Sequence, residues 1–187
     1  MNAKTMIKTT TLACLVTLIG MPLLRADTGT STTTPQRGQL SESDYRFAVK
    51  AARGGREEVE LGQLAKEKGS SEAVRSFGSQ MVTDHSKAND ELTRLLSRKG
   101  ASLPPTIAPS GRSTIDELQK ASGPDFDKTY AKAMVKDHKK DVREFESASK
   151  DITDPDLRAW VEKTLPTLQQ HLQMAQDMEN TIKSEKS

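Results

Sequence analysis

Three histidines and one glutamate have the side chains and the positions that could bind a metal ion. They are Glu58, His85, His138 and His171, and these histidines are all that the chain contains. Each of the four lies on the apolar face of a different predicted helix, near the middle of that helix, so a bundle would bring them into one layer. Imidazole and carboxylate are ligands for zinc, iron, copper and manganese. The pattern therefore predicts one transition metal ion (Zn, Fe, Cu or Mn) in the core.

Two aspartates and three methionines lie close to these histidines in the sequence. Asp84 and Asp137 each precede a histidine, and neighbouring helical residues point about 100° apart. We therefore expect both aspartates to flank the site and to orient a histidine on a neighbouring helix. Met81, Met134 and Met174 are alternative soft ligands that would favour copper. The other interpretation of these methionines is that they only fill the core.

A metal-free polar layer is the alternative to a metal site. A buried polar group without a partner costs about 1–3 kcal/mol, so the histidines and the glutamate must be satisfied by one another, by water or by a metal. Without a metal, the protein is a non-enzymatic structural or interaction bundle whose polar layer fixes the helix register. With a metal, metal handling or envelope stress is the expected role, and an oxidoreductase is a third hypothesis. The sequence has no motif for nucleophilic catalysis, and no catalytic residue is assigned.

Four long helical patterns must position these residues. They cover about 43–68, 72–99 and 125–151, and a fourth pattern follows 153–156 and reaches about Lys183. Apolar residues recur at steps of three and four in each pattern. Aromatic residues make up only 4% of the chain, which argues against a sheet protein.

The lengths of the connections predict how the helices are joined. The first and last connections are short, whereas the middle one spans 100–123 and includes a short helical segment from about Ser113. We therefore predict an all-α, ferritin-like four-helix bundle over residues 43–184, with a long crossover that makes the second and third long helices parallel. An up-and-down bundle with a loose middle loop is the alternative.

A sequence echo links the second and third long helices. Residues 81–85 (MVTDH) return as residues 134–138 (MVKDH). Duplication of a pair of helices is one interpretation, and chance similarity between two amphipathic helices is the other.

The first 42 residues are predicted to lie outside the bundle. Lys4 and Lys8 precede an apolar run over 11–24, and Ala26 offers a cleavage point, so residues 1–26 are expected to be a signal peptide. Residues 27–42 are rich in Thr, Ser, Gly and Pro and are predicted to be a disordered tether. The expected location is the periplasm or another exported compartment. An uncleaved N-terminal anchor is the alternative, and no membrane span is predicted in the mature chain.

The composition of the mature chain excludes several functions. Removing Lys4, Lys8 and Arg25 from the 28 basic residues leaves 25 against 26 acidic residues. The sequence shows no basic face with stacking aromatics, so no nucleic-acid partner is expected. The only cysteine, Cys14, lies in the predicted signal peptide, so neither a disulfide nor a thiolate nucleophile is predicted. The sequence identifies no protein partner.

Several motifs spread over the chain carry a family resemblance. They are Ala51-Ala52-Arg53-Gly54-Gly55, Glu58-Val59-Glu60-Leu61-Gly62, the stretch 81–89 (MVTDHSKAN), Gly123-Pro124-Asp125-Phe126-Asp127, and Thr164-Leu165-Pro166 with His171-Leu172. Through them the sequence resembles the exported bacterial family catalogued as domain of unknown function 4142, over about residues 44–178. The resemblance implies a ferritin-like fold and an exported location, and it implies no particular reaction. By position it indicates Glu58, Asp84, His85, His138 and His171 as the polar residues of interest.

The sequence departs from the ligand pattern of di-iron bundles. That pattern requires Glu-x-x-His on two helices. Here the residues three before the histidines are Val82, Val135 and Leu168. A single-metal site is therefore favoured over a di-iron centre.

Overall fold

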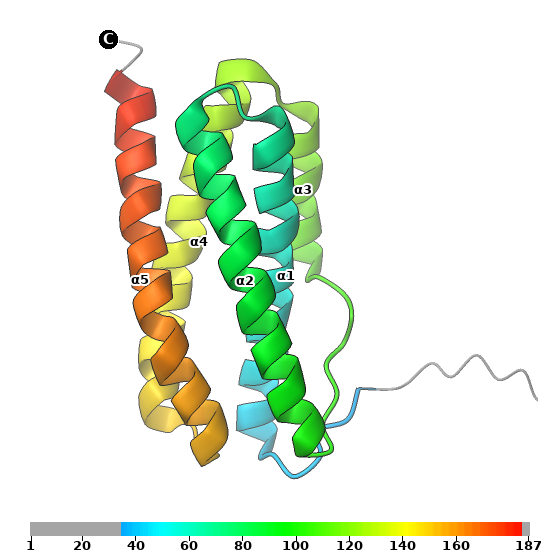
Figure 1. Cartoon of the computed structure of the whole chain (residues 1–187). Coiled ribbons are helices and arrows are strands. Elements are labelled where there is room, and N and C mark those ends of the chain that lie inside the picture. Colours follow the sequence, from blue (N-terminus) through cyan, green and yellow to red (C-terminus); the bar gives the residue numbers. More distant parts are fainter. Residues whose placement is uncertain (1–34, 185–187) are drawn as a thin grey trace, which may run out of the picture. The chain divides into compact units, whose positions relative to one another are not determined.

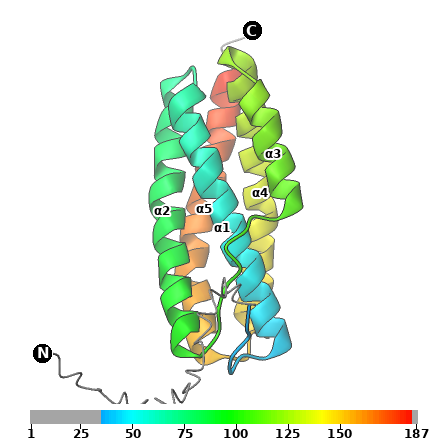
Figure 2. The same cartoon turned by 90° about the vertical axis from the view of Figure 1, so that its right-hand side faces the viewer.

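The computed structural model describes residues 35–184, which form five helices (Figures 1 and 2). The helices are α1 (Glu42–Lys68), α2 (Glu72–Arg98), α3 (Pro109–Lys120), α4 (Gly123–Asp151) and α5 (Pro155–Ser184). Apart from one isolated bridge, the regular structure of this region is helical, so the all-α prediction is confirmed. The predicted signal peptide (1–26) and the first part of the predicted tether lie outside the described residues.

The connectivity is that of two antiparallel helix pairs joined by a crossover. α1 packs on α2, and α4 packs on α5. The chain after α2 returns along the bundle through α3, so α4 runs in the same direction as α2 (Figures 1 and 2). The predicted crossover is confirmed, and the up-and-down alternative is wrong. α3 starts earlier than predicted because Pro109 occupies its first turn, where a proline is well tolerated.

The crossover helix packs onto the bundle through a few apolar residues. Ile115 and Leu118 are both buried, and they belong to the same apolar cluster as Leu61 of α1. Arg56 donates from Nη1 to the carbonyl of Pro104 at 2.7 Å. These contacts hold the long connection against α1, which a loose middle loop would lack.

Two buried aspartates join the helix pairs to each other. Near the start of α1, the carboxylate of Asp44 accepts from the Thr153 hydroxyl at 2.8 Å and from the Asp154 backbone at 2.9 Å, in the α4–α5 turn. Near the start of α4, the carboxylate of Asp127 accepts from Ser70 and from the Ser71 backbone at 2.8 Å, in the α1–α2 turn. Each helix pair thus supplies a carboxylate that accepts hydrogen bonds from the turn of the other pair. Without it, the backbone N–H groups of that turn would be unpaired.

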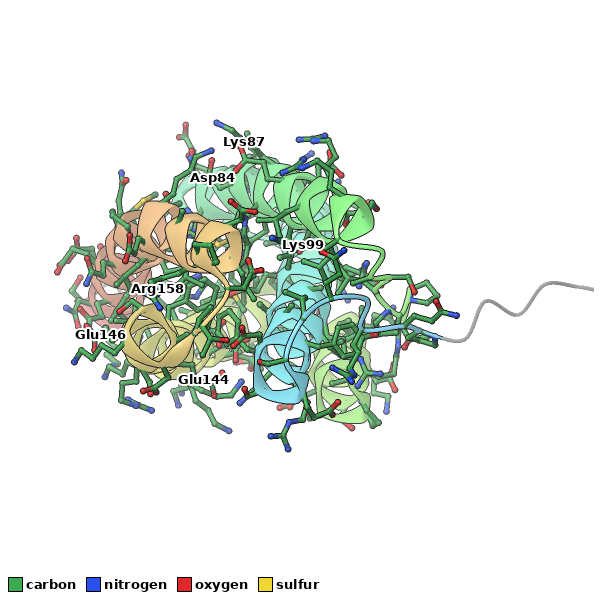
Figure 3. All side chains as sticks on the ribbon, turned by 90° about the horizontal axis from the view of Figure 1, so that it is seen from below. Asp84, Lys87, Lys99, Glu144, Glu146 and Arg158 are labelled. Carbon is green, nitrogen blue, oxygen red and sulfur yellow. The ribbon has the colours of Figure 1, made fainter. Side chains whose placement is uncertain are left out.

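Three of the five described helices, α1, α2 and α5, begin at side-chain caps. Ser41 accepts from the Asp44 backbone N–H, Ser71 accepts from that of Val74, and Asp154 accepts from that of Leu157. Figure 3 views the bundle from the end that is lower in Figure 1 and labels Lys99, whose Nζ lies 2.9 Å from Asp154. These interactions satisfy backbone donors that a helix leaves free in its first turn.

The polar layer divides the core into two apolar clusters. One cluster includes Ala52, Leu92 and Leu168, and the other includes Leu61, Met81 and Ala175. On α1, α2 and α5, the polar residue of the layer lies in sequence between members of the two clusters. The predicted central layer is therefore present in the structure.

The last residues of the predicted tether are ordered, which corrects that prediction. Arg37 forms an antiparallel bridge with Ala101, and the Gln39 backbone donates to the carbonyl of Lys99 at 3.1 Å. Leu40 is 1% exposed and joins an apolar cluster of the core. Gly38 has a φ of +55°, a value that glycine adopts readily. A single buried leucine and the strand-like pairing hold this segment despite its polar composition.

Candidate metal centre

The four predicted residues meet in one buried layer. Glu58 comes from α1, His85 from α2, His138 from α4 and His171 from α5, and none of them is more than 5% exposed. The imidazole centroids lie 5.2 Å, 5.5 Å and 5.8 Å apart. The structure therefore brings together the four residues that the sequence placed at mid-height on separate helices.

Each histidine uses one ring nitrogen to bind an acceptor on the protein. His85 Nδ1 lies 2.9 Å from Oε2 of Glu58. His138 Nδ1 lies 3.0 Å from the carbonyl oxygen of Met134, and His171 Nε2 lies 2.9 Å from Oδ2 of Asp84. The carbonyl oxygen of Met134 and the ionised carboxylate of Asp84 can only accept, so Nδ1 of His138 and Nε2 of His171 carry the proton. Nδ1 of His85 carries it when Oε2 of Glu58 accepts, that is, when Glu58 is ionised or has its own proton on Oε1. These contacts fix the tautomer and the orientation of each imidazole.

The other nitrogen of each histidine is buried and has no hydrogen-bond partner within the described residues. These atoms are Nε2 of His85, Nε2 of His138 and Nδ1 of His171. The three histidines offer ligand atoms that all lie within 4.8 Å of one another. Metal-binding histidines commonly bind a carboxylate or a carbonyl through their second nitrogen, which is the arrangement seen here. The residues fit a transition metal ion.

Glu58 contacts two of the three imidazoles. Its Oε2 pairs with His85, and its Oε1 lies 3.3 Å from Nε2 of His138. Oε1 of an ionised Glu58 and Nε2 of His138 are both hydrogen-bond acceptors, because His138 has its proton on Nδ1. Two atoms bound to one tetrahedral metal at about 2.1 Å lie about 3.4 Å apart. The spacing of Glu58 and His138 therefore suits a shared cation, or a proton on Glu58.

Burial disfavours the charged forms of Glu58 and of the three histidines. It lowers the pKa of His85 and that of His171 to about 4, and it lowers the pKa of His138. Burial also raises the pKa of Glu58 to about 8. At neutral pH the imidazoles are therefore uncharged, which is the form that binds metals. The contacts of Glu58 are then hydrogen bonds of a neutral carboxyl group and not ion pairs.

The two predicted flanking aspartates have different positions. Asp84, which is labelled in Figure 3, binds a histidine of the neighbouring helix as expected. Burial tends to raise the pKa of Asp84, but hydrogen bonds from Gln80 and His171 outweigh it and hold that pKa below its usual value. Asp137 makes no hydrogen bond to a histidine in the described region. It lies instead with Glu58 and Asp141, because α4 turns it towards α1.

The methionines lie in the core on one side of the layer. Met81 and Met134 are fully buried in the apolar cluster that contains Leu61, and Met174 packs against the same cluster. Met134 contributes to the site through its backbone carbonyl, which accepts from His138. These positions agree with the core interpretation of the methionines.

A carboxylate that the sequence analysis did not select also lies at the centre. Asp141 groups with Glu58 and Asp137, and burial raises its pKa to about 8. The available signal was spacing, because Asp141 follows Asp137 by one helical turn and therefore lies on the same face. All three carboxylates line a partly open cavity of about 540 Å³ between α1 and α4.

The comparisons identify a family and a solved structure with a similar fold. In residues 35–184, no helix combines the length and the apolar composition of a membrane span. The crystal structure of a DUF305 fragment from Deinococcus radiodurans has a similar fold, with a TM-score of 0.66 and 13% identity, over 78% of this chain and 98% of that chain. No curated protein matches the sequence. The family model described as "Domain of unknown function (DUF4142)" matches residues 29–178, and the chain therefore belongs to this family.

Proposed function

We propose that the domain binds one transition metal ion in its core and serves in metal handling. The observation that carries the proposal is the convergence of three buried imidazoles, each of which has one ring nitrogen without a hydrogen-bond partner among the described residues. The second nitrogen of each imidazole already has an acceptor, on Glu58, Asp84 or the backbone of Met134. Three buried acceptors that no donor among the described residues satisfies are costly without a cation.

The donor set favours zinc or copper among the four predicted metals. Three neutral imidazoles suit both ions. Oε1 of Glu58 is placed to complete a fourth position next to His138. A metal held by three histidines and closed by a carboxylate has no free position, which favours storage or transfer of the ion over catalysis.

The competing function is a metal-free structural bundle, and one observation favours it. With its raised pKa, Glu58 carries a proton at neutral pH, and this proton can be donated to Nε2 of His138 across 3.3 Å. That hydrogen bond would satisfy one imidazole of the layer. The free nitrogens of His85 and His171 would still lack a donor among the described residues.

Elemental analysis of the purified full chain tests the proposal. The samples are the wild type, His85→Ala, His138→Ala, His171→Ala and the control Asp90→Ala, which changes an exposed residue of α2. We expect about one equivalent of a single metal in the wild type and the control, and well below one equivalent in each histidine variant, because each variant lacks one of the proposed ligands. Far-UV circular dichroism of each variant shows whether the bundle is still folded.

Two results would overturn the metal proposal. One is a wild-type protein that contains no metal and takes up none from buffered Zn, Cu, Fe or Mn. The other is full metal content in all three histidine variants. The first result would leave the metal-free structural bundle as the function, and the second would show that the metal binds outside the histidine layer.

We also propose that the domain works in the periplasm or another exported compartment. The support is the basic, then apolar, then small-residue order of residues 1–26. Intact mass measurement of the protein from fractionated cells tests this. A chain that begins at Asp27 in the exported fraction is the expected result, and a full-length chain in the cytosolic fraction would contradict it.

A further inference from the structure

The carboxylates of Glu58, Asp137 and Asp141 form a second group beside the histidines. Each offers an oxygen within 4.8 Å of the other two. We propose that these three residues form a second cation site, which takes a hard divalent cation such as Mn²⁺ and shares Glu58 with the histidine centre. Carboxylate oxygens and water are the ligands that Mg²⁺, Ca²⁺ and Mn²⁺ prefer. The inference goes beyond the proposed function and does not require a metal on the histidines.

Glu58 provides the observation that points to a ligand. Its side chain is 1% exposed, and its Oε1 accepts no hydrogen bond within the described residues. This oxygen lies 3.3 Å from Nε2 of His138, and an oxygen of the same carboxyl group lies within 4.8 Å of the carboxylates of α4. A buried oxygen in this position requires a proton or a cation.

The relation between the two helix pairs explains why acids of α1 and α4 meet. Asp44 of α1 and Asp127 of α4 make equivalent contacts to the turn of the opposite pair. Glu58 follows Asp44 by the same interval as Asp141 follows Asp127. Glu58 and Asp141 are thus counterparts in the two helix pairs, and Asp137 lies one turn before Asp141 on the same face of α4.

Access and charge also suit a cation. The three carboxylates line the cavity between α1 and α4, which is partly open. Lys140 is the basic residue nearest to the two aspartates, but its Nζ lies 3.7 Å from each of them, beyond hydrogen-bond distance. Its side chain is 51% exposed. Lys140 can therefore turn into the solvent when a cation replaces it, at little cost for an exposed side chain.

Binding of Mn²⁺ to the full chain tests the inference. The protein is first stripped of metal with a chelator, and free Mn²⁺ is followed by electron paramagnetic resonance during a titration. We expect about one bound Mn²⁺ in the wild type and a dissociation constant at least about tenfold higher in Asp141→Asn and in Asp137→Asn, because each variant replaces a carboxylate ligand by an amide. The matched control is Glu144→Gln, since Glu144 lines the same cavity but pairs with Lys50 at 2.7 Å (Figure 3).

A histidine variant separates this site from the histidine centre. His171 binds Asp84 and does not contact Glu58, so His171→Ala should keep Mn²⁺ binding within about twofold while it weakens the histidine centre. The inference is overturned if the wild type binds no Mn²⁺, or if both aspartate variants bind it as well as the wild type. It is also overturned if His171→Ala loses Mn²⁺ while Asp141→Asn retains it, because the ion would then lie among the histidines.

Discussion

At the scale of single residues, the hydrogen-bond partners decide what each histidine can do. A histidine on an apolar helix face can serve as a core residue or as a ligand, and its position does not distinguish the two roles. In this structure the acceptors for His85, His138 and His171 are a glutamate, a backbone carbonyl and an aspartate. These partners leave the other nitrogen of each ring without a hydrogen-bond partner among the described residues, and these nitrogens are the atoms that could bind a metal.

Removing the carboxylate of Asp84 should weaken metal binding without unfolding the bundle. Asp84→Ala leaves Nε2 of His171 without its acceptor, so the ring loses its fixed orientation. We expect metal affinity to fall about 10–100-fold, measured by competition with a chromophoric chelator. Asp90→Ala, on the exposed side of the same helix, should have no effect. Equal affinities for the two variants would show that Asp84 does not support the site.

At the scale of helices, small residues set how closely α1 and α2 approach. A Cβ atom on Gly78 would lie 2.7 Å from the carbonyl oxygen of Gly62 and 2.7 Å from Cβ of Ala65. A Cβ atom on Gly62 would lie equally close to the carbonyl of Gly78. The two glycines therefore allow a backbone contact that any larger residue would force apart.

A pair of glycine substitutions tests this contact. Gly78→Ala should destabilise the domain by about 1–3 kcal/mol, because the added methyl group overpacks against backbone. Gly54→Ala is the control, since a Cβ atom there meets nothing within 4 Å, and it should stabilise the helix by about 0.5–1 kcal/mol. Urea unfolding of both variants measures the difference. If both substitutions change the free energy of unfolding in the same direction, the close approach of α1 and α2 is contradicted.

The buried aspartates that join the helix pairs, Asp44 and Asp127, should make the stability of the domain sensitive to acid. Burial tends to raise the pKa of Asp127, but hydrogen bonds from Ser70 and Ser71 outweigh it and hold that pKa below its usual value. A lowered folded-state pKa gives stability that is present above the unfolded pKa of about 3.9 and is lost as the pH falls through the folded value. Asp127→Ala should therefore lose about 2–3 kcal/mol at neutral pH and depend less on pH below about 4.

Unfolding in urea at several pH values checks this prediction. The control is Asp125→Ala, which changes an exposed residue in the first turn of the same helix. If the free energy of unfolding of Asp127→Ala falls as steeply at acid pH as that of the control, the carboxylate of Asp127 is not the cause of the acid sensitivity.

The sequence echo and the structural symmetry of the helix pairs do not coincide. The repeated sequence matches α2 with α4. The contacts to the turn of the opposite helix pair instead match Asp44 of α1 with Asp127 of α4. Duplication of a helix pair would match α1 with α4 and α2 with α5. The repeated Met-x-x-x-His spacing is explained instead by one requirement on two parallel helices, since each must place a histidine next to a buried methionine at the layer.

At the scale of the whole domain, the proposed metal would couple binding to stability. All four long helices contribute a residue to it, so a bound ion would hold both helix pairs together. Unfolding would separate the ligands and release the ion. A ligand that binds only the folded state stabilises that state by mass action.

Metal should therefore raise the melting temperature of the domain. At a free metal concentration of about 100 times the dissociation constant, the stabilisation is about 2.7 kcal/mol. For a domain of this size, this corresponds to a rise of about 5–10 °C, which calorimetry can measure with and without a chelator. His85→Ala should show no such rise. A melting temperature that does not respond to any of Zn, Cu, Fe or Mn would argue for the metal-free layer.

The sequence by itself determined the helices, their pairing and the layer. Apolar spacing fixed the faces of α1, α2, α4 and α5, and the lengths of the connections indicated the crossover. The same spacing placed Glu58, His85, His138 and His171 at one height, because the middle of each helix in such a bundle lies in one plane.

Only the tertiary structure decided the chemistry of the site. The sequence treated Asp84 and Asp137 alike, yet the packing of α2 on α5 brings Asp84 to His171 while α4 turns Asp137 towards Glu58. The burial of Leu40 and the role of Asp141 also depend on contacts between distant segments. Helical periodicity gives the face on which a side chain lies, whereas its partner depends on how closely and at what rotation the neighbouring helix packs.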